Sequence, residues 1–279
     1  STKIPSVVAD LVERLVGEEE AVGIGIGAAG FVGEDRATVR FAPNIDGREE
    51  PRADHVRSLV DLPVVVENDA NAAAWGEFRF GAGEDTDDLL LVTIGTGIGG
   101  GIVHKGQLFR GGFGVAAEIG HMRIVPNGIL CGCGQHGCFE QYASGSALVR
   151  DARERVANGD ENAGALAALA DGDLSRITGP GITKLAQQGD QLSLELLRDV
   201  GRWIGEGIAV LAAVLDPSVI AIGGGVAAAG DLLLPTVVEA FETHLPARAH
   251  RPEASVRLAA LGNEAGIIGA ADLARVEPA

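Results

Sequence analysis

Residues 87–112 read DDLLLVTIGTGIGGGIVHKGQLFRGG, and this stretch decides the fold. An apolar run enters a glycine-rich turn, and the residues after it alternate between apolar and polar as a strand does. Gly95, Gly97 and Gly100 fit the G-x-G-x-x-G spacing, but a dinucleotide fold needs a helix directly after the glycines. The stretch therefore predicts a β-hairpin whose turn holds phosphate through backbone N–H groups and the hydroxyl of Thr96. A tight turn without a ligand is the alternative.

Strands and helices alternate along the rest of the chain. The polar stretch after residue 66 is expected to turn into a helix that ends at glycines near residue 81. Strand patterns lie at 21–32, 63–66, 87–112, 218–226 and 255–261, and helical patterns at 6–16, 144–157, 160–171, 190–214, 230–243 and 265–276. This order predicts an α/β architecture.

Length and charge limit the classes of protein to which the chain can belong. Its 279 residues are enough for one large domain or two smaller ones. A net charge of −17 repels phosphate backbones and anionic lipid, so nucleic acid and membrane surfaces are not expected as partners. The sequence contains no uncharged apolar run of membrane-spanning length and no secretion-signal pattern, so we expect a cytoplasmic protein.

All three cysteines lie in one short segment, ILCGCGQHGCFEQ, at residues 129–141. An odd number of cysteines cannot form a closed disulfide framework, and Cys131 and Cys133 are too close in sequence for an unstrained mutual disulfide. Thiolates spaced C-x-C-x4-C, as in Cys131, Cys133 and Cys138, suit zinc. Three buried small apolar side chains are the alternative.

A tetrahedral zinc site needs a fourth ligand in addition to the thiolates. His121, ten residues upstream, is the best candidate, and His136 inside the segment is its competitor. Glu118 and Glu140 flank the same region of sequence. A bound metal would therefore fix an imidazole and two carboxylates near one point and build a binding site.

Six segments together resemble the ROK family (repressor, open reading frame, kinase), and within it the bacterial ROK glucokinases. They occur in the family's order and cover most of the chain. The segments are FAPNI (41–45), VENDANAAAWGE (66–77), TIGTGIGGGIV (93–103), GVAAEIGHMRI (114–124), CGCGQHGCFEQYASG (131–145) and DPSVIAIGGGV (216–226).

The resemblance implies an actin-like ATPase (ribonuclease H-like) fold of two α/β domains with a cleft between them. We expect a small domain at residues 1–74, completed by a C-terminal helix at 264–279, and a large domain at 75–263 that carries the zinc-binding loop. The family's D-x-G-G-T phosphate hairpin does not occur in these 279 residues. The sheet of the small domain is therefore expected to have an open edge.

The resemblance also implies phosphoryl transfer from ATP, with Mg²⁺, to glucose, and it assigns residues to this reaction. Asp69 matches the catalytic base, although capping of the following helix is the alternative role for this aspartate. His121 matches a residue that both binds zinc and contacts the sugar. The implied sugar-binding residues are Gly30, Asn44, Asn68, Asp69, Glu118, His121 and Glu140. The implied nucleotide-binding residues are Gly95, Thr96, Gly97, Gly224 and Gly225.

Several alternatives remain open at this point. A ROK kinase for N-acetylmannosamine, allose or fructose shares these motifs, and polyphosphate could replace ATP as the donor. A non-catalytic, sugar-sensing ROK repressor is the alternative from a different class of protein. The presence of Asp69 and of the Gly95–Gly97 turn, together with the acidity of the chain, disfavours a repressor. The resemblance further implies a homodimer or homotetramer.

Overall fold

The structure is a computed structural model that describes residues 4–16, 21–41 and 48–276. The chain forms two compact units, and each is described by itself below. The first unit consists of residues 1–91, 100–117 and 260–279, and the second of residues 92–99 and 118–259. The division predicted at residue 74 falls inside one continuous helix, α3, and the domain limits given by the sequence stay a prediction.

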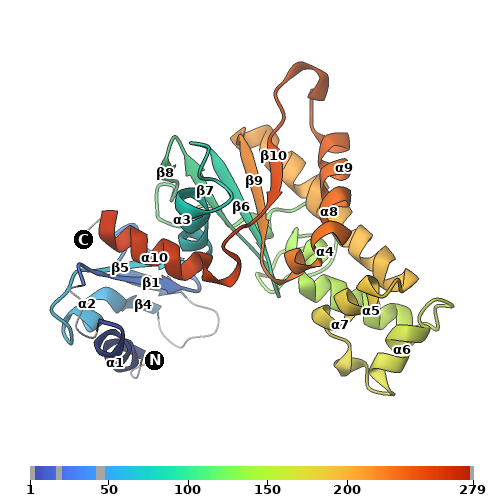
Figure 1. The fold of residues 1–279 in the computed structure, drawn as a ribbon, viewed down its shortest axis with the longest axis horizontal. Helices are drawn as coiled ribbons and strands as arrows, with labels where there is room; N and C mark the ends of the chain where they lie inside the picture. The colour runs from blue at the N-terminus through green and yellow to red at the C-terminus, as the bar shows by residue number, and fades with distance from the viewer. Residues whose placement is uncertain (1–3, 17–20, 42–47, 277–279) are drawn as a thin grey trace. The chain divides into compact units, whose positions relative to one another are not determined.

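The first unit is built on two parallel strands, β1 and β5, which pair with Ile24 opposite Val64. Figure 1 shows α10 on one side of these strands and α1 and α2 on the other. An antiparallel sheet of β2, β3 and β4 completes the part of the unit that precedes β5. The elements are α1 (Ile4–Val16), β1 (Ile24–Ala28), β2 (Phe31–Val32), β3 (Thr38–Phe41), β4 (Arg48–Pro51), α2 (Arg52–Arg57), β5 (Val64–Asn68), α3 (Asp69–Phe80), β8 (Gln107–Leu108) and α10 (Ala265–Val276).

Small residues let α3 and α10 pack with their backbones almost in contact. A Cβ atom on Gly76 would lie 2.4 Å from the carbonyl oxygen of Ala265, and one on Gly269 would lie 1.7 Å from that of Ala72. Across the same contact, the indole N–H of Trp75 donates a 2.8 Å hydrogen bond to the buried carboxylate of Asp272. These contacts fix α3, and therefore the residues at its N-terminus, against the C-terminal helix.

Strand β1 pairs on one side only, because β5 is its one partner among the described strands. A groove of about 570 Å³ follows this edge, lined by Val12 and Leu15 of α1, by β1 and by Ile267 of α10. Strongly apolar lining residues such as Leu15 and Ile267 are exposed there, at 81% and 75%. The open edge of the small-domain sheet agrees with what the resemblance predicts.

A third sheet, of five strands, has the order β10-β9-β6-β7-β8 and draws residues from both units. Its central strands β6 (Leu89–Ile94) and β7 (Ile98–His104) form the predicted hairpin around the glycine-rich turn. The remaining elements, all of the second unit, are η1 (Ile119–His121), α4 (Glu140–Ala143), α5 (Gly145–Ala157), α6 (Gly164–Ala170), η2 (Leu174–Arg176), α7 (Gly179–Gln187), α8 (Gln191–Leu215), β9 (Val219–Gly223), η3 (Gly225–Leu232), α9 (Leu234–His244), η4 (Arg248–His250) and β10 (Ser255–Leu258). The short η5 (Gly262–Glu264) precedes α10 in the first unit.

The 25-residue helix α8 organises the second unit. Its Gly205 lies against α9, where a Cβ atom would come within 2.5 Å of the Cβ atom of Ala240. Its Gly207 leaves room for the ring of Phe139, which is completely buried and anchors the cysteine segment. Every residue of β9 is buried, as expected for a parallel strand covered on both faces.

Most of the predicted helices and strands are confirmed, and the α/β architecture with them. The helices predicted at 6–16, 144–157, 190–214 and 265–276 correspond to α1, α5, α8 and α10 with ends shifted by a few residues at most. No helix in the described ranges has both the length and the apolar character needed to cross a lipid bilayer.

Candidate active site

The turn from β5 into α3 places two polar residues in different roles. Asn68 is the N-cap of α3, and its side-chain oxygen accepts hydrogen bonds from the backbone N–H groups of Ala70 (2.9 Å) and Asn71 (3.0 Å). Asp69 is the first helical residue, its side chain is exposed, and one carboxylate oxygen accepts from the N–H of Ala70 at 2.9 Å. The capping role that was the alternative for Asp69 thus belongs mainly to Asn68, so the carboxylate of Asp69 remains available for chemistry.

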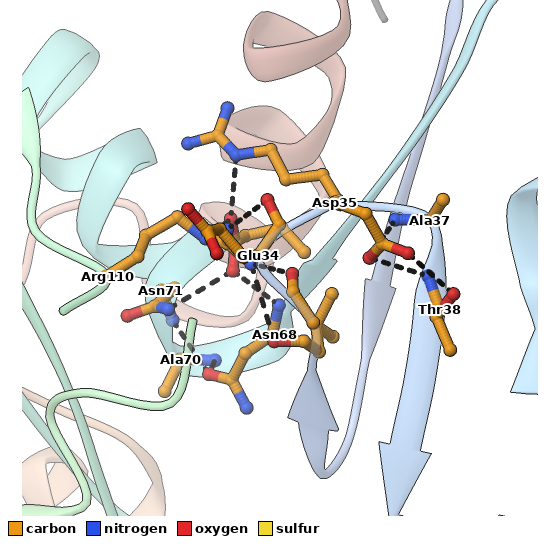
Figure 2. Close-up of polar contacts among 12 residues, drawn as sticks. Glu34, Asp35, Ala37, Thr38, Asn68, Ala70, Asn71 and Arg110 are labelled. Carbon is orange, nitrogen blue, oxygen red and sulfur yellow. Dashed lines mark hydrogen bonds and ion pairs between the residues drawn. The ribbon is translucent and has the colours of Figure 1, made fainter. Parts of the chain in front are cut away.

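The residues predicted to bind sugar in the first unit lie around this turn. The side-chain N–H of Asn68 donates a 3.1 Å hydrogen bond to the carbonyl oxygen of Gly30, which ties the loop after β1 to the start of α3 (Figure 2). With both oxygen lone pairs and one N–H used, Asn68 has one N–H left to donate. Asp69 is the one charged residue among those lining the groove along β1. Asn44 lies outside the described residues.

The cysteine segment folds back on the residues around His121. The N–H of Phe139 donates to the carbonyl oxygen of Met122 at 2.8 Å, and the N–H of Ile124 donates to that of Gly137 at 2.9 Å. Gly137 has φ +77°, and a Cβ atom there would lie 1.7 Å from the carbonyl oxygen of Val125, so only glycine fits. This pairing brings His121 next to thiols that are ten or more residues away in sequence.

One candidate metal site results from this fold. The ligand atoms of His121, Cys131, Cys133 and Cys138 all lie within 4.8 Å of one another, whereas His136 is not part of the group. The sulfur atoms of Cys133 and Cys138 are 3.6 Å apart, and Nδ1 of His121 is 3.7 Å from the sulfur of Cys131. Sulfur ligands at about 2.3 Å from a tetrahedral zinc ion are separated by about 3.8 Å. The donor set and its spacing therefore fit zinc.

The protonation of the thiols depends on their surroundings. A hydrogen bond from the backbone of Gln135 lowers the pKa of Cys133, which is exposed. Burial and, after it, the neighbouring Cys133 and Cys131 together raise the pKa of Cys138 to about 12. A metal ligand must be a thiolate, so a bound cation would have to displace the proton from Cys138.

The two carboxylates predicted near the metal group differ in what holds them. Glu118 is exposed and directly precedes η1. Gly120 of η1 packs closely on β7, since a Cβ atom there would lie 2.2 Å from the carbonyl oxygen of Ile98. Glu140, the first residue of α4, is half-buried. One of its oxygens lies 3.8 Å from the sulfur of Cys131, and the other accepts from the N–H of Ile98 at 3.1 Å. Glu140 thus connects the cysteine segment with the glycine-rich turn.

The turn at residues 95–97 is also held by the start of α5. The N–H of Gly145 donates to the carbonyl oxygen of Gly95 at 2.8 Å, and that of Ser146 donates to Thr96 at 3.2 Å. A side chain on Gly97 would collide with Glu140, because a Cβ atom would lie 2.0 Å from the carboxylate oxygen. Thr96 is exposed, so its hydroxyl can reach a ligand, whereas the N–H of Gly95 is donated to the carbonyl oxygen of Gly97 at 3.0 Å.

The second predicted glycine turn lies next to the first. Gly224 has φ +83°, and a Cβ atom there would lie 2.6 Å from the backbone nitrogen and oxygen of Ile94, so this position requires glycine. Gly225, by contrast, faces open space. Together the two turns border a cavity of about 750 Å³, within the usual range for sites that bind small molecules.

Sequence reasoning identified Gly95, Thr96 and Gly225 in the lining of this cavity and missed the residues supplied by helices. The missed residues are Gly145, Ser146, Leu148, Val149, Arg150, Arg153 and Glu154, from α5, Gly179, Pro180 and Thr183, from α7, and Val226. Arg153 donates hydrogen bonds to the carbonyl oxygens of Ser175 and Ile177 and so holds the segment before α7 against α5. The T-G-P sequence at 178–180, a helix cap with proline near the first turn, is a signal that could have located α7.

The α/β architecture and the similarity to solved ROK structures give the chain the actin-like ATPase fold of sugar phosphotransferases. The ROK family model matches residues 2–277, and the chain belongs to the ROK family.

Named relatives include sugar kinases and repressors. The glucokinase of Streptomyces coelicolor is 50% identical over 272 residues, which are 98% of this chain and 86% of that protein. A solved structure of a ROK family glucokinase from Streptomyces griseus, in complex with glucose and AMPPNP, superposes with a TM-score of 0.89 at 51% identity, covering 99% of this chain and 88% of that one. The xylose repressor of Caldicellulosiruptor bescii is 32% identical over 85% of this chain but only 60% of its own length.

Proposed function

We propose that the protein is a glucokinase, which transfers the terminal phosphoryl group of ATP to glucose and forms glucose 6-phosphate. The observation that carries the proposal is the state of Asp69. Its carboxylate stands exposed at the first position of α3, while Asn68 provides the cap that the helix needs. The similarity to glucokinases at 50% and 51% identity over nearly the whole chain supports the same activity.

Asp69 is the base in this proposal. The sugar hydroxyl is a poor nucleophile, and a carboxylate that accepts its proton assists attack on phosphorus. The bond from the sugar oxygen to the γ-phosphorus forms, the bond from that phosphorus to the bridging oxygen breaks, and ADP leaves with the electron pair. Asp69 is well suited because its one hydrogen bond among the described residues is to the N–H of Ala70.

We infer that each of the two groups of predicted residues can form hydrogen bonds with sugar hydroxyls. In the first unit, Asn68 has one N–H to donate, and the carbonyl oxygen of Gly30 accepts its other N–H. Glu118 and Glu140 accept hydrogen bonds, and His121 presents the ring nitrogen that does not face Cys131. Such a set recognises several hydroxyl groups at once and favours a hexose.

The metal group holds zinc in this proposal, with His121, Cys131, Cys133 and Cys138 as ligands. Zinc bound by four protein ligands has no open position, so its role is to fix the loop. Zinc then aims His121 and Glu140 at the sugar. Mg²⁺ enters with ATP and neutralises charge on the phosphates, as phosphoryl transfer generally requires.

The nucleotide occupies the 750 Å³ cavity in the second unit. The turn with Gly95, Thr96 and Gly97 contacts the phosphates in this proposal, chiefly through the hydroxyl of Thr96, and Gly225 lines the wall of the cavity. We further propose that the protein works in the cytoplasm as a homodimer or homotetramer, which light scattering on purified protein would test.

The decisive experiment is a panel of sugars and donors with the full-length protein. Glucose, fructose, allose and N-acetylmannosamine are each combined with ATP and with polyphosphate, and formation of ADP and sugar phosphate is followed. We expect the highest kcat/KM for glucose with ATP. A higher kcat/KM for another hexose would assign a different sugar kinase, and no turnover with any pair would favour a sugar-sensing protein.

A further inference from the structure

A buried carboxylate that the proposed mechanism does not use lies directly before Asn68 and Asp69. Glu67 is 1% exposed, and its two oxygens have different partners. One oxygen accepts hydrogen bonds from the backbone N–H of Asn68 at 2.9 Å and from the side-chain N–H of Asn71 at 3.1 Å. The other forms ion pairs with Arg110 at 2.8 Å and with Arg36 at 3.5 Å. Asn68, Asn71 and Arg110 of this cluster are labelled in Figure 2.

Arg110 reaches Glu67 from the loop that follows β8 and is itself held by backbone. Its guanidinium donates hydrogen bonds to the carbonyl oxygens of Gly33 (2.8 Å) and Glu34 (3.2 Å). Four residues further on, Gly114 packs on the same turn, and a Cβ atom there would lie 2.7 Å from the carbonyl oxygen of Val32. The loop after β8 is therefore clamped to the turn between β2 and β3.

Arg36 connects this same turn to β5. Its carbonyl oxygen accepts a 2.8 Å hydrogen bond from the N–H of Val66, and its side chain pairs with the next residue, Glu67. The pKa of Arg36 is lowered overall, because burial and the nearby positive charge of Arg110 outweigh the opposite effect of Glu67. Asp35 stabilises the turn by accepting hydrogen bonds from the backbone N–H groups of Ala37 and Thr38.

A chain of hydrogen bonds connects Glu67 with the backbone around Asp69. Glu67 fixes the backbone N–H of Asn68, and Asn68 fixes the N–H groups of Ala70 and Asn71. The backbone on both sides of Asp69 is thus set by hydrogen bonds that start at Glu67. The Asp69 side chain has little holding it besides this backbone, so its direction depends on how firmly Glu67 is placed.

We propose that Glu67, held in place by Arg36 and Arg110, is a positioning residue for Asp69. The inference rests on the proposed function, in which Asp69 is the base. The negative charge of Glu67 is essential to this role, because two guanidinium groups pair with one of its oxygens and a neutral side chain would lose the attraction to both. Glu67 then acts on the rate of phosphoryl transfer through Asp69 and leaves the nucleotide cavity unaffected.

The test compares Glu67→Gln in β5 with Glu77→Gln, a matched control in α3, the helix that follows β5. Glu77 is also completely buried, and it accepts hydrogen bonds from the backbone N–H groups of Ala82, Ala260 and Leu261 far from Asp69. Both variants should lower Tm. We expect Glu67→Gln to lower kcat about 10- to 100-fold, the scale for a misplaced catalytic group, with KM for ATP unchanged. Glu77→Gln should keep kcat within about twofold of the wild type.

A double-mutant cycle with Asp69→Asn separates positioning from general loss of structure. If Glu67 acts through Asp69, adding Glu67→Gln to Asp69→Asn should change kcat by less than about twofold. Effects that multiply would overturn the positioning role and leave the base intact. Full turnover by Asp69→Asn alone would overturn the role of Asp69 as base, and the positioning role with it, whereas no turnover of any sugar by the wild type would overturn the proposed function.

A second variant covers the case in which Glu67→Gln fails to fold. Arg110→Lys keeps the positive charge but loses the fork that contacts Glu67 and the Gly33 carbonyl together. Arg110→Lys should lower kcat, but less strongly than Glu67→Gln does. In a protein that already carries Asp69→Asn, it should leave kcat unchanged. Wild-type kcat in a folded Arg110→Lys variant would contradict the proposal.

Discussion

Replacing Cys133 with alanine tests whether the metal group serves sugar recognition. Cys133 is the exposed member of the group, so removing its thiol leaves no cavity in the core, in contrast to the buried Cys131 and Cys138. Three ligands hold zinc far less tightly than four, and zinc binding supplies much of the folding energy of such loops. Zinc content should therefore fall, and the loop should lose its fixed shape.

The expected loss of glucose affinity can be estimated from the contacts. His121 loses the ion that orients it, and Glu140 loses the ordered Cys131 next to it. Two polar contacts at about 1–3 kcal/mol each correspond to at least a tenfold increase in the Kd for glucose. The nucleotide turn depends on the loop through one hydrogen bond, from Ile98 to Glu140. Its loss, at about 1 kcal/mol, limits the decrease in nucleotide affinity to about fivefold.

Calorimetry with glucose and with AMPPNP on the wild type and the variant measures both quantities. His136→Ala is the matched control, because His136 lies in the same segment but outside the metal group, and it should change neither zinc content nor affinity. Loss of zinc with an unchanged Kd for glucose would refute the reasoning, since the metal would then only hold the loop together. Equal losses for both ligands, with a native circular dichroism spectrum, would refute the separation of the two sites.

Purified protein should contain one zinc ion per chain by elemental analysis, with affinity falling as pH falls, because burial raises the pKa of Cys138 and binding must release its proton. Asp69→Asn should lower kcat about 10²-fold while glucose binding, measured by calorimetry, is largely kept. Gly225→Leu should raise the Kd for AMPPNP without unfolding, since this position faces open space, whereas Gly224→Ala should lower Tm because its Cβ atom would meet Ile94. Burial raises the pKa of Asp35, but hydrogen bonds from Thr38 and Ala37 outweigh it and the pKa is lowered. The stability that Asp35 contributes is therefore present above the ordinary pKa of 3.8 and is lost as the pH falls below that value. Asp35→Asn should accordingly make the free energy of unfolding depend less on pH in this acid range.

The sequence pointed to the candidate metal group because the proposed ligands are rare residues with short spacing. Three cysteines in eight positions and one histidine ten residues upstream left the choice between His121 and His136 open. The structure favours His121, because residues 122–125 pair with 137–139 and so bring His121 to the thiols. That pairing is a tertiary feature, and no local pattern of apolar residues reports it.

The lining of the cavity that we propose for the nucleotide was predicted only in part, for a similar reason. Glycine turns after strands are visible in sequence, because close backbone approach and positive φ require glycine, as at Gly224. The opposite wall comes from α5 and α7, which line the same cavity although more than twenty residues separate them. Their lining residues, such as Arg150 and Thr183, follow ordinary helical patterns and carry no local mark of function.

The segment VENDAN shows how one short motif divides structural and chemical tasks among neighbouring side chains. Glu67 is buried and binds two arginines from other segments, Asn68 caps α3, and Asp69 is left exposed with one local hydrogen bond. The division has a physical reason, since a carboxylate that caps a helix is held by backbone N–H groups and is a weaker acceptor for a substrate proton. Placing the cap on the amide of Asn68 keeps the Asp69 carboxylate free to accept that proton. Because Arg110 is more than forty residues from Glu67, the sequence could single out the aspartate but could not reveal what holds it in place.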